Sequence, residues 1–289
     1  MKTWKAHSAH VNKVLFSPDS QYIVSAGFKG ELFLWGVEQE EKVQVFEGHT
    51  ETINGVCWFD KGRKIISASG DGTILTHEIS SSRPLQQRKD LKSGVQHLKV
   101  TKDENYFITS TKANMITLWE MTDGELVKKV KSDKNNIGVL ETGKHHNHAI
   151  IGGLDSAVRR FDLPSCEELE QMDAHTEATM GFCFFDEDRH AVSIGYDGGL
   201  ILWDMTTHQA LEKFKVGDKG YYGLDVSPDG LEVAITMPYQ LKRISLSNLS
   251  VIENELPAKG NYSVNYSPDG SNLVIGSADK SIRTINILT

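Results

Sequence analysis

Residues 193–204 read SIGYDGGLILWD. The small residues after Asp197 predict a tight turn, and the apolar run that ends at Trp203 predicts a short strand. Ser193 stands before the turn, and His175 lies upstream. Because serine, histidine and aspartate together can form the catalytic set of a hydrolase, the first question is whether this stretch reacts with a substrate or supports a fold.

The stretch belongs to an internal repeat. Tryptophans end an apolar run at a spacing of 84 residues, which is twice a period of 42: Trp35, Trp119 and Trp203. Hydroxyl residues follow the same step of 42, with Ile151 in the fourth place: Ser25, Ser67, Thr109 and Ser193. A period of this length indicates a repeat architecture.

Each repeat predicts four short strands joined by turns. The first resembles VNKVLF at 11–16, and the second resembles YIVSAG at 22–27. The third is like TILTHEI at 73–79, and the fourth is like VQVFEGH at 43–49. Short strands with Pro, Gly and Asp turns at this spacing predict an all-β protein rather than a coiled coil or a helical solenoid.

Two dipeptide markers add a family resemblance. Gly48-His49 opens a unit and Trp203-Asp204 closes one, and both resemble the WD40 repeat. The resemblance covers the whole chain in seven units. It implies one domain over residues 1–289, an all-β, seven-bladed WD40 β-propeller with four-stranded antiparallel blades. Blade six is the weakest match, and the register of residues 237–245 stays open by one residue.

The chain ends predict how the ring closes. The last unit stops at Thr289 after its third strand, and the period places residues 1–4 where the fourth strand of that unit belongs. We therefore expect the N-terminal strand to complete the last blade and close the ring, which removes an exposed sheet edge. The ring then uses nearly every residue and leaves none for a second domain.

For the opening stretch, the resemblance implies support rather than reaction. In WD40 blades that resemble this one, a hydrogen-bonded network joins four side chains: His175, Ser193, Asp197 and Trp203. A related set recurs as His49, Ser67 and Asp71, and partly as His7 and Ser25. Because a catalytic set occurs once in a fold, and no GxSxG turn is present, we predict a blade scaffold with no catalytic residue and no enzyme activity.

The same network is eroded in other blades. Different residues fill its places: Lys29 and Ala113 for aspartate, Leu91 and Asp133 for histidine, and Tyr239 and Ser245 in blade six. Only blade five keeps all four residue types. We therefore expect uneven blade stability, with blades three and six softer.

A histidine run, HHNH, raises the question of a metal. His145, His146 and His148 fall in the turn between the first and second strands of blade four. Imidazoles bind Zn²⁺, Ni²⁺ and Cu²⁺, but the sequence places no cysteine or carboxylate beside the run to complete a site. The acidic run 186–188 is interpreted as a solvated loop. We predict a solvated turn, no metal ligands and no cofactor, and whether the run binds metal stays open.

The resemblance also implies where a partner binds. In WD40 proteins the loop before the first strand and the turn between the second and third strands share the end of the blade called the top. The residue before the turn aspartate and two residues of the inner strand project there. These positions are largely apolar or aromatic in blades four to seven and one: His10, Asn12, Phe28, Leu154, Met180, Tyr196, Tyr222 and Tyr262. Blades two and three offer polar residues, so we predict an aromatic arc on one side of the top face.

Composition narrows the classes of partner. The formal net charge of −8 argues against nucleic acid as the main partner, because phosphate contacts need clustered Lys and Arg. No apolar run is long enough for a transmembrane helix, and no secretory signal opens the chain, so no membrane is predicted. Three widely spaced cysteines match neither a zinc pattern nor a disulfide framework, which favours a cytoplasmic or otherwise intracellular setting.

We therefore predict a non-catalytic scaffold or adaptor that binds other proteins or peptides on the top face. It is expected to be monomeric on its own or a subunit of a larger complex. One alternative is a reader of a single short peptide at the top opening. Another is a propeller enzyme, since fold does not determine function. A third is a stabilising role in an assembly, with contacts on the side faces.

Overall fold

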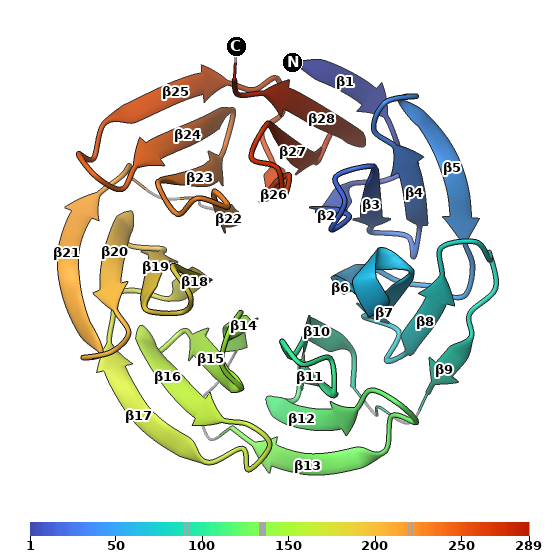
Figure 1. Ribbon diagram of the computed structural model, residues 1–289, viewed down its shortest axis with the longest axis horizontal. Coiled ribbons are helices and arrows are strands. Elements are labelled where there is room, and N and C mark those ends of the chain that lie inside the picture. The colour runs from blue at the N-terminus through green and yellow to red at the C-terminus, as the bar shows by residue number, and fades with distance from the viewer. Residues whose placement is uncertain (90, 92, 133–136, 219, 221, 289) are drawn as a thin grey trace. The chain divides into compact units, whose positions relative to one another are not determined.

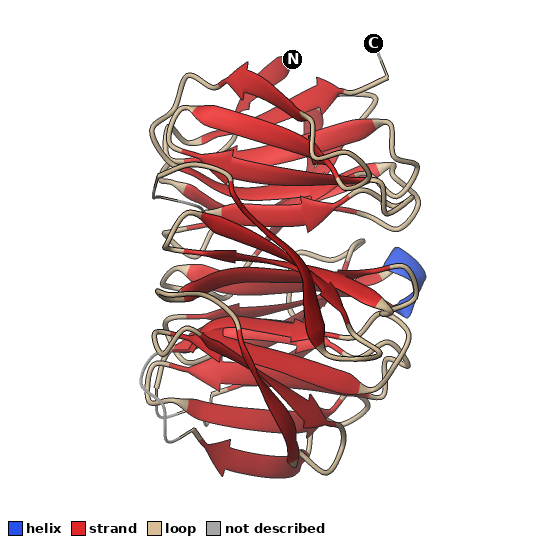
Figure 2. Cartoon of the chain, turned by 90° about the vertical axis from the view of Figure 1, so that its left-hand side faces the viewer, coloured by secondary structure: helices blue, strands red, loops and turns tan. Residues whose placement is uncertain are grey.

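In a computed structural model, the chain consists of strands almost throughout (Figures 1 and 2). The structure describes residues 1–288 except 90, 92, 133–136, 219 and 221. Helical structure among these residues is limited to one turn of 3-10 helix, η1 (Asp60–Gly62). Across the same described ranges, no helix has the length and apolar character needed to cross a membrane. The strands form seven four-stranded antiparallel sheets, which confirms the predicted all-β, seven-bladed propeller class.

The chain divides into two compact units, residues 1–96 with 222–289 and residues 97–221. The first unit holds blades one, two, six and seven. Blade one comprises β2 (Val11–Phe16), β3 (Tyr22–Gly27), β4 (Leu32–Gly36) and β5 (Glu41–Phe46). Blade two comprises β6 (Ile53–Phe59), β7 (Lys64–Ser69), β8 (Ile74–Glu78) and β9 (Gln86–Arg88). Blade six comprises β22 (Gly223–Val226), β23 (Glu232–Met237), β24 (Gln240–Ser245) and β25 (Val251–Glu255). Blade seven comprises β26 (Asn261–Tyr266), β27 (Asn272–Ser277), β28 (Ser281–Asn286) and β1 (Lys2–Lys5).

The second unit holds blades three, four and five, and the boundary between the units falls inside β10. Blade three comprises β10 (Val95–Val100), β11 (Tyr106–Thr111), β12 (Met115–Glu120) and β13 (Leu126–Lys131). Blade four comprises β14 (Ile137–Thr142), β15 (His148–Gly153), β16 (Ala157–Asp162) and β17 (Glu168–Asp173). Blade five comprises β18 (Thr179–Phe185), β19 (His190–Gly195), β20 (Gly199–Asp204) and β21 (Gln209–Lys215).

The core lies between adjacent blades rather than inside one sheet. In the second unit, Val139 and Ile150 of blade four share one buried cluster with Phe182 and Trp203 of blade five. A middle strand such as β15 is therefore buried at every position, because both of its faces are covered. The fourth strands are mostly exposed, as in β21. This explains why second strands carry mostly apolar or small residues, whereas fourth strands mix charged residues with exposed apolar ones.

Blade six has a shorter turn than blade five, which settles its register. In blade five Ala191 pairs with Trp203, whereas in blade six Val233 pairs with Ile244. The turn around Tyr239 is therefore one residue shorter. The expectation that Ser245 fills the tryptophan position is wrong, because Ile244 lies there.

The N-terminal strand completes blade seven, as predicted. β1 pairs antiparallel with β28, with Trp4 opposite Ile282, and the two strands lie side by side in Figure 1. The Trp4 ring packs against the buried cluster that includes Ile282 and lies 6.0 Å from the Trp35 ring. Thr289, where the last unit was expected to stop, lies outside the described residues. Residues from both ends of the sequence thus form one sheet.

Deleting residues 1–5 would remove β1, expose the edge of β28 and uncover Ile282. We expect the free energy of unfolding to fall by about 3–5 kcal/mol, the usual cost of losing a packed tryptophan. Urea denaturation of the truncated and intact chains measures this. As a control, replacing Lys2 and Lys5 by serine keeps the strand and Trp4, and should cost at most about 1 kcal/mol. An unchanged denaturation midpoint in the truncated chain would show that β1 is dispensable.

Candidate functional site

The Ser193 hydroxyl is the centre of a hydrogen-bonded network in blade five. The indole Nε1–H of Trp203 donates to Ser193 Oγ at 3.0 Å, and His175 Nε2 lies 2.9 Å from the same oxygen. Because the Asp197 carboxylate can only accept, the proton of the neutral His175 ring is on Nδ1, and Nε2 accepts the Ser193 O–H. This leaves His175 Nδ1–H directed at Asp197 Oδ1, 3.2 Å away. The structure thus brings together all four residues of the opening stretch and its upstream histidine.

This Ser-His-Asp arrangement supports the blade and does not face a substrate. The Ser193 side chain is fully buried, and its oxygen contacts the indole and the imidazole. Gly195 is needed beside it, because a Cβ there would come within 2.4 Å of the His175 ring. Asp197 accepts the backbone N–H groups of Thr176 and Gly199 at 2.8 and 2.9 Å. The network therefore joins the loop before β18 to the turn after β19.

The charges in the network are set by burial and hydrogen bonding. Burial lowers the pKa of His175, against the attraction of Asp197. Burial opposes ionisation of Asp197 as well, but the N–H groups of Thr176 and Gly199 hold the pKa of that carboxyl below its usual range. At neutral pH a neutral imidazole thus donates a hydrogen bond to a carboxylate.

Blade two holds a variant of the network. His49 Nε2 lies 2.9 Å from Ser67 Oγ, but its Nδ1 approaches Thr73 Oγ1 at 2.8 Å and Asp71 only at 3.5 Å. His77 replaces the tryptophan, and its Nε2 lies 3.0 Å from the carbonyl oxygen of Glu47 instead of reaching the serine. Blade two therefore keeps the histidine–serine contact but lacks the indole N–H that donates to the serine in blade five.

Blade one is more complete than the sequence predicts. His7 Nε2 lies 2.7 Å from Ser25 Oγ, which also accepts the Trp35 indole N–H at 2.8 Å. Glu31 takes the part of the missing aspartate, with its carboxylate 3.2 Å from His7 Nδ1. The interpretation of Lys29 as a break in the network is corrected, because the longer glutamate side chain reaches the histidine from two residues later.

Arginines bind the turn aspartate in blades four and seven. Arg159 forms an ion pair with Asp155, and Arg283 forms one with Asp279. Arg283 also donates to Ser277 Oγ at 2.7 Å. Asp133, which was predicted to stand in the histidine position of blade four, lies outside the described residues. Sequence reasoning missed these arginines, although each stands four residues after its aspartate.

Blade three keeps only one contact of the network among its described residues. The Trp119 indole N–H donates to Thr109 Oγ1 at 3.0 Å. Leu91, an apolar residue in the histidine position, offers no ring nitrogen to the threonine. Within the described part of the chain, Leu91 thus provides no side-chain hydrogen bond like that of His175 in blade five.

Predicted partner-binding residues lie at β-bulges. In the first strands of blades one, five and seven, the pairing skips one residue: Asn12, Met180 and Tyr262. A bulge leaves its extra residue unpaired and redirects its side chain. The residue before the turn is held nearby, since Phe28 N–H donates to the His10 carbonyl and Tyr196 N–H to the Ala178 carbonyl. Two backbone features thus place these side chains at the top of the blades.

Four of the predicted residues form one group in the first unit, which we call the aromatic cluster: His10, Phe28, Tyr222 and Tyr262. The Phe28 ring lies 5.0 Å from His10 and stacks on Tyr262 at 5.7 Å. Tyr222 meets the edge of Tyr262 at 5.5 Å and 78°. Phe28 and Tyr222 remain 38% and 40% exposed. Residues of blades six, seven and one therefore share one partly exposed aromatic surface.

The other predicted partner-binding residues differ in their surroundings. The Asn12 side-chain amide donates to the Ile53 carbonyl at 2.8 Å, which links blade one to blade two. Leu154, Met180 and Tyr196 are exposed on the second unit. The predicted continuous arc includes residues of both units and stays a prediction.

The structure corrects the interpretation of the histidine run. A carboxylate does lie beside it: the Asp188 side chain is buried, although the acidic run 186–188 was expected to be solvated. Asp188 lies 3.5 Å from His146 Nδ1. His148 is also buried, which lowers its pKa to about 4 despite the attraction of Asp188. Of the three histidines, His145 and His146 are exposed as predicted, and His148 is not.

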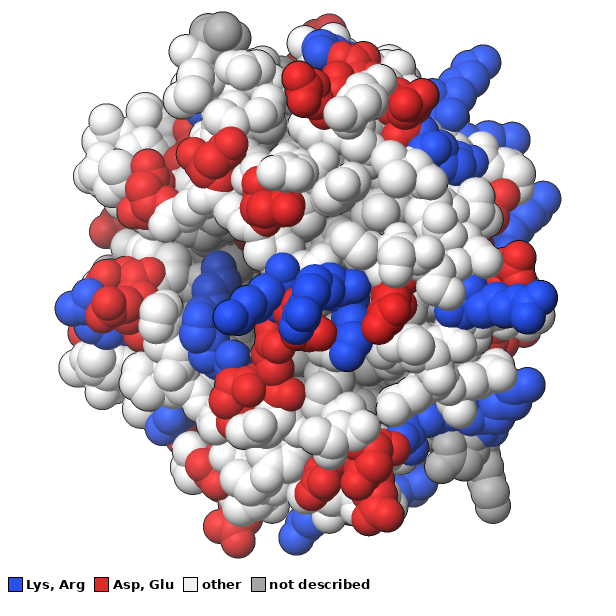
Figure 3. All heavy atoms as spheres, turned by 45° about the vertical axis from the view of Figure 1, so that its right-hand side comes forward, with Lys and Arg blue, Asp and Glu red and all other residues white. Residues whose placement is uncertain are grey.

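Charged side chains of both signs lie close together on the surface. Figure 3 shows Asp and Glu side chains beside many of the Lys and Arg side chains. Lys99 pairs with Glu141 at 2.6 Å, and Arg189 pairs with Asp186 at 2.7 Å. Such pairing reduces the positive field that a phosphate backbone would need.

Comparison with known proteins identifies the repeat. The family model described as "WD domain, G-beta repeat" matches residues 1–36, 40–75 and 258–286. The chain is 22% identical over 272 residues to Meiotic fizzy-related protein 1 of Schizosaccharomyces pombe, covering 90% of this chain and 63% of that protein.

Two further relatives are similar to the chain at nearly the same level of identity. Pre-mRNA-processing factor 17 of Homo sapiens is 21% identical over 83% of this chain and 44% of that protein. Guanine nucleotide-binding protein subunit beta of Zea mays is 22% identical over 74% of this chain and 60% of that protein. The chain spans less than two thirds of the length of each of these three relatives.

Replacing Ser193 by alanine would leave the Trp203 indole N–H and the His175 imidazole without their shared buried partner. We expect the free energy of unfolding to fall by about 2–4 kcal/mol, because two buried polar groups lose a hydrogen bond. Denaturant titration measures the change. Thr109→Val is the matched control and should cost less, since among the described residues Thr109 Oγ1 accepts the Trp119 N–H but contacts no histidine. Equal losses in the two variants would contradict a central role for the Ser193 hydroxyl.

Acid should destabilise the fold in part through His7. Burial lowers the pKa of His7 to about 4 from 6.5, against the attraction of Glu31 and with a smaller contribution from Lys42. The unfolded chain therefore binds a proton at His7 between pH 6.5 and about 4 while the folded chain does not, so stability falls as the pH falls through this window. We expect His7 to contribute about 1–3 kcal/mol of this loss.

The measurement is the free energy of unfolding at several pH values between 7 and 4. His7→Gln should give a shallower pH dependence than the unchanged chain, whatever its stability at pH 7. His145→Gln, at an exposed histidine, should keep the original slope. If His7→Gln keeps that slope too, His7 is not the group that titrates.

Proposed function

Because this chain is a WD40-repeat protein, we propose that it is a non-catalytic scaffold that binds a segment of a partner protein at the top of its blades. The aromatic cluster of the first unit is the observation that carries this proposal. Large exposed aromatic surfaces on a folded protein commonly mark partner sites. Aromatic residues also supply much of the binding energy at protein interfaces.

The cluster is held in place before any partner arrives. Phe28 is fixed by its backbone hydrogen bond to His10, and Tyr262 is fixed at a β-bulge and stacked on Phe28. A surface with so few free torsions loses little conformational entropy on binding. Tyr222 and Tyr262 add hydroxyl groups to an otherwise apolar surface, which suits a partner side chain that combines both characters.

The chemistry of the cluster favours a peptide segment with an apolar or cationic side chain. Aromatic faces attract ammonium and guanidinium groups, and the net charge of −8 attracts a cationic segment over a longer range. The same charge supports a protein rather than a nucleic acid as the partner. A reader of one short peptide would use this same surface, and it differs from a scaffold in needing no contact beyond the cluster.

Burial of the Ser193 hydroxyl supports a non-catalytic role, since the chain's most complete Ser-His-Asp set has no open face. Side-face binding has its own candidates, because the fourth strands expose apolar residues such as Val45, Leu211 and Ile252. The partners and the intracellular setting of the whole protein are part of this proposal and rest on the sequence arguments above.

The test replaces Phe28, Tyr222 and Tyr262 together by alanine. Peptides are first selected from a random library on the unchanged chain, and their Kd values for both chains are then compared. We expect binding to weaken at least about tenfold, since each interfacial aromatic contributes on the order of 1–2 kcal/mol. Circular dichroism checks that the variant is folded.

The matched control replaces Val45, Leu211 and Ile252 by serine, which removes as many exposed apolar side chains from the fourth strands. It should leave binding unchanged. If the control loses binding and the aromatic variant keeps it, the partner site lies on the side faces. Tyr196→Ala, measured with the same peptides, tests whether the second unit contributes.

A further inference from the structure

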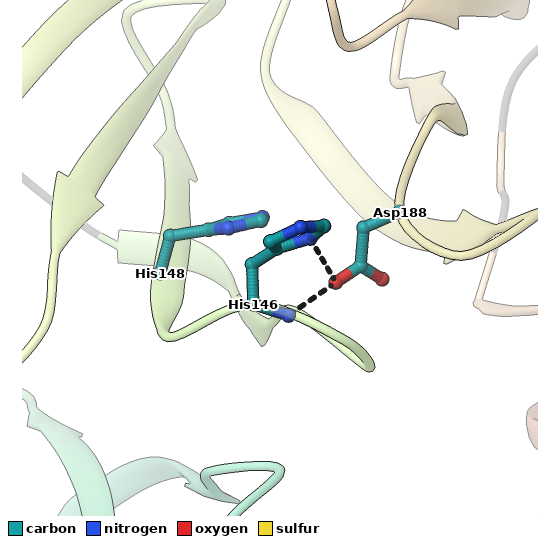
Figure 4. Close-up of side chains that lie close together, drawn as sticks. All are labelled: His146, His148 and Asp188. Atoms are coloured by element: carbon teal, nitrogen blue, oxygen red, sulfur yellow. Dashed lines mark hydrogen bonds and ion pairs between the residues drawn. The ribbon is translucent and has the colours of Figure 1, made fainter.

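Three side chains converge at the end of blades four and five that lies opposite their tops. His146 comes from the turn before β15, His148 is the first residue of β15, and Asp188 comes from the turn before β19. One ring nitrogen of each histidine and one carboxylate oxygen all lie within 4.8 Å of one another. Figure 4 shows the two imidazole rings facing each other, with the Asp188 carboxylate reaching them from the neighbouring turn. We propose that these three side chains bind one divalent transition-metal ion of the Zn²⁺ type.

Asp188 is a fixed ligand. Its side chain is fully buried, and its carboxylate accepts backbone N–H groups of the facing turn: Lys144 at 2.8 Å, His145 at 2.6 Å and His146 at 3.0 Å. These bonds hold the carboxylate against the histidine run and offset the cost of its burial. Two of them go to Oδ2 and one to Oδ1, so one lone pair of Oδ1 remains for a cation.

His148 is the second fixed ligand, and it carries the independent sign of a missing group. The residue is 7% exposed, and its Nε2 atom is buried without a hydrogen-bond partner. Phe184 holds the ring in an edge contact at 4.8 Å. A buried polar atom left unpaired costs free energy, and coordination to a metal ion would satisfy a ring nitrogen directly.

His146 is the adjustable ligand. Its side chain is 67% exposed, and its ring is 6.1 Å from His148 at an interplanar angle of 20°. Ligands of a tetrahedral zinc ion lie about 3.3 Å apart, given bonds of about 2 Å, so the donor atoms must close in by roughly 1–1.5 Å. Rotation of the exposed His146 ring moves its nitrogen relative to the two buried ligands.

The surrounding charges permit a cation. Arg160 and His208 act on His148 with positive charge, but both are paired with Glu170. Two imidazoles and a carboxylate match the ligands that zinc and neighbouring transition metals prefer. The ion would join blades four and five, and its remaining coordination position would face solvent on the His146 side.

The experiment uses the untagged full chain after treatment with a chelator and dialysis. Co²⁺ is titrated while its visible absorption is followed, because histidine and carboxylate ligands in a tetrahedral site change that spectrum. Zn²⁺ is then measured by displacement of Co²⁺. We expect one equivalent of metal to bind, and His146→Ala to bind at least about tenfold more weakly, since even outer-shell changes cost ten- to a hundredfold.

His145→Ala is the matched control, because this neighbour is equally part of the run but lies outside the three-ligand group. It should bind metal as the unchanged chain does. A second readout is thermal unfolding: Zn²⁺ should raise the Tm of the unchanged chain and of His145→Ala, but not of His146→Ala. Absence of one-equivalent binding, or equal affinities in the two variants, would overturn the proposal.

Discussion

The buried hydroxyl of the second strand is the contact on which the best-preserved blades depend. Ser193 and Ser25 each accept a tryptophan indole N–H and contact a histidine nitrogen with one oxygen atom. Because a hydroxyl both donates and accepts, it satisfies two buried polar groups that would otherwise cost free energy. The third strand and the loop before the first strand are thereby joined to the same atom. In blade four an apolar residue, Ile151, stands in this position, and the turn aspartate pairs with Arg159 instead.

The partner of the turn aspartate is much less restricted. Blade five uses a histidine for Asp197, whereas blades four and seven use Arg159 and Arg283, and blade one moves the carboxylate to Glu31. The partners are buried, but the carboxylates that they bind are partly exposed, and either an imidazole or a guanidinium can bind them there. The hydroxyl position lies in the core, where shape and hydrogen-bonding capacity are both constrained. This difference explains why the repeat is obvious at some positions and obscure at others.

The rigid blades leave two ends that can carry function. At the top, β-bulges and short turns direct side chains such as Tyr262 and Phe28 away from the ladder. At the opposite end of blades four and five, two turns and the start of β15 bring His146, His148 and Asp188 together. In both places the strands fix the backbone, and the residues beyond the strands are free to vary. A scaffold with one constant core can therefore carry unrelated sites.

The sequence by itself determined the period of 42, the all-β class and the place of the N-terminal strand in the last unit, and its resemblance to the WD40 repeat implied the seven blades. These follow from local alternation and turn residues, which repeat along the chain and need no knowledge of distant contacts. It also indicated the residues of the aromatic cluster, but not that their rings touch. Only the tertiary structure decided that Glu31 reaches His7, that Ile244 replaces Ser245, and that Asp188 turns inward with a φ of 64° to meet the histidine run. Each of these depends on the length of one turn or the direction of one side chain, and neither leaves a periodic signal in the sequence.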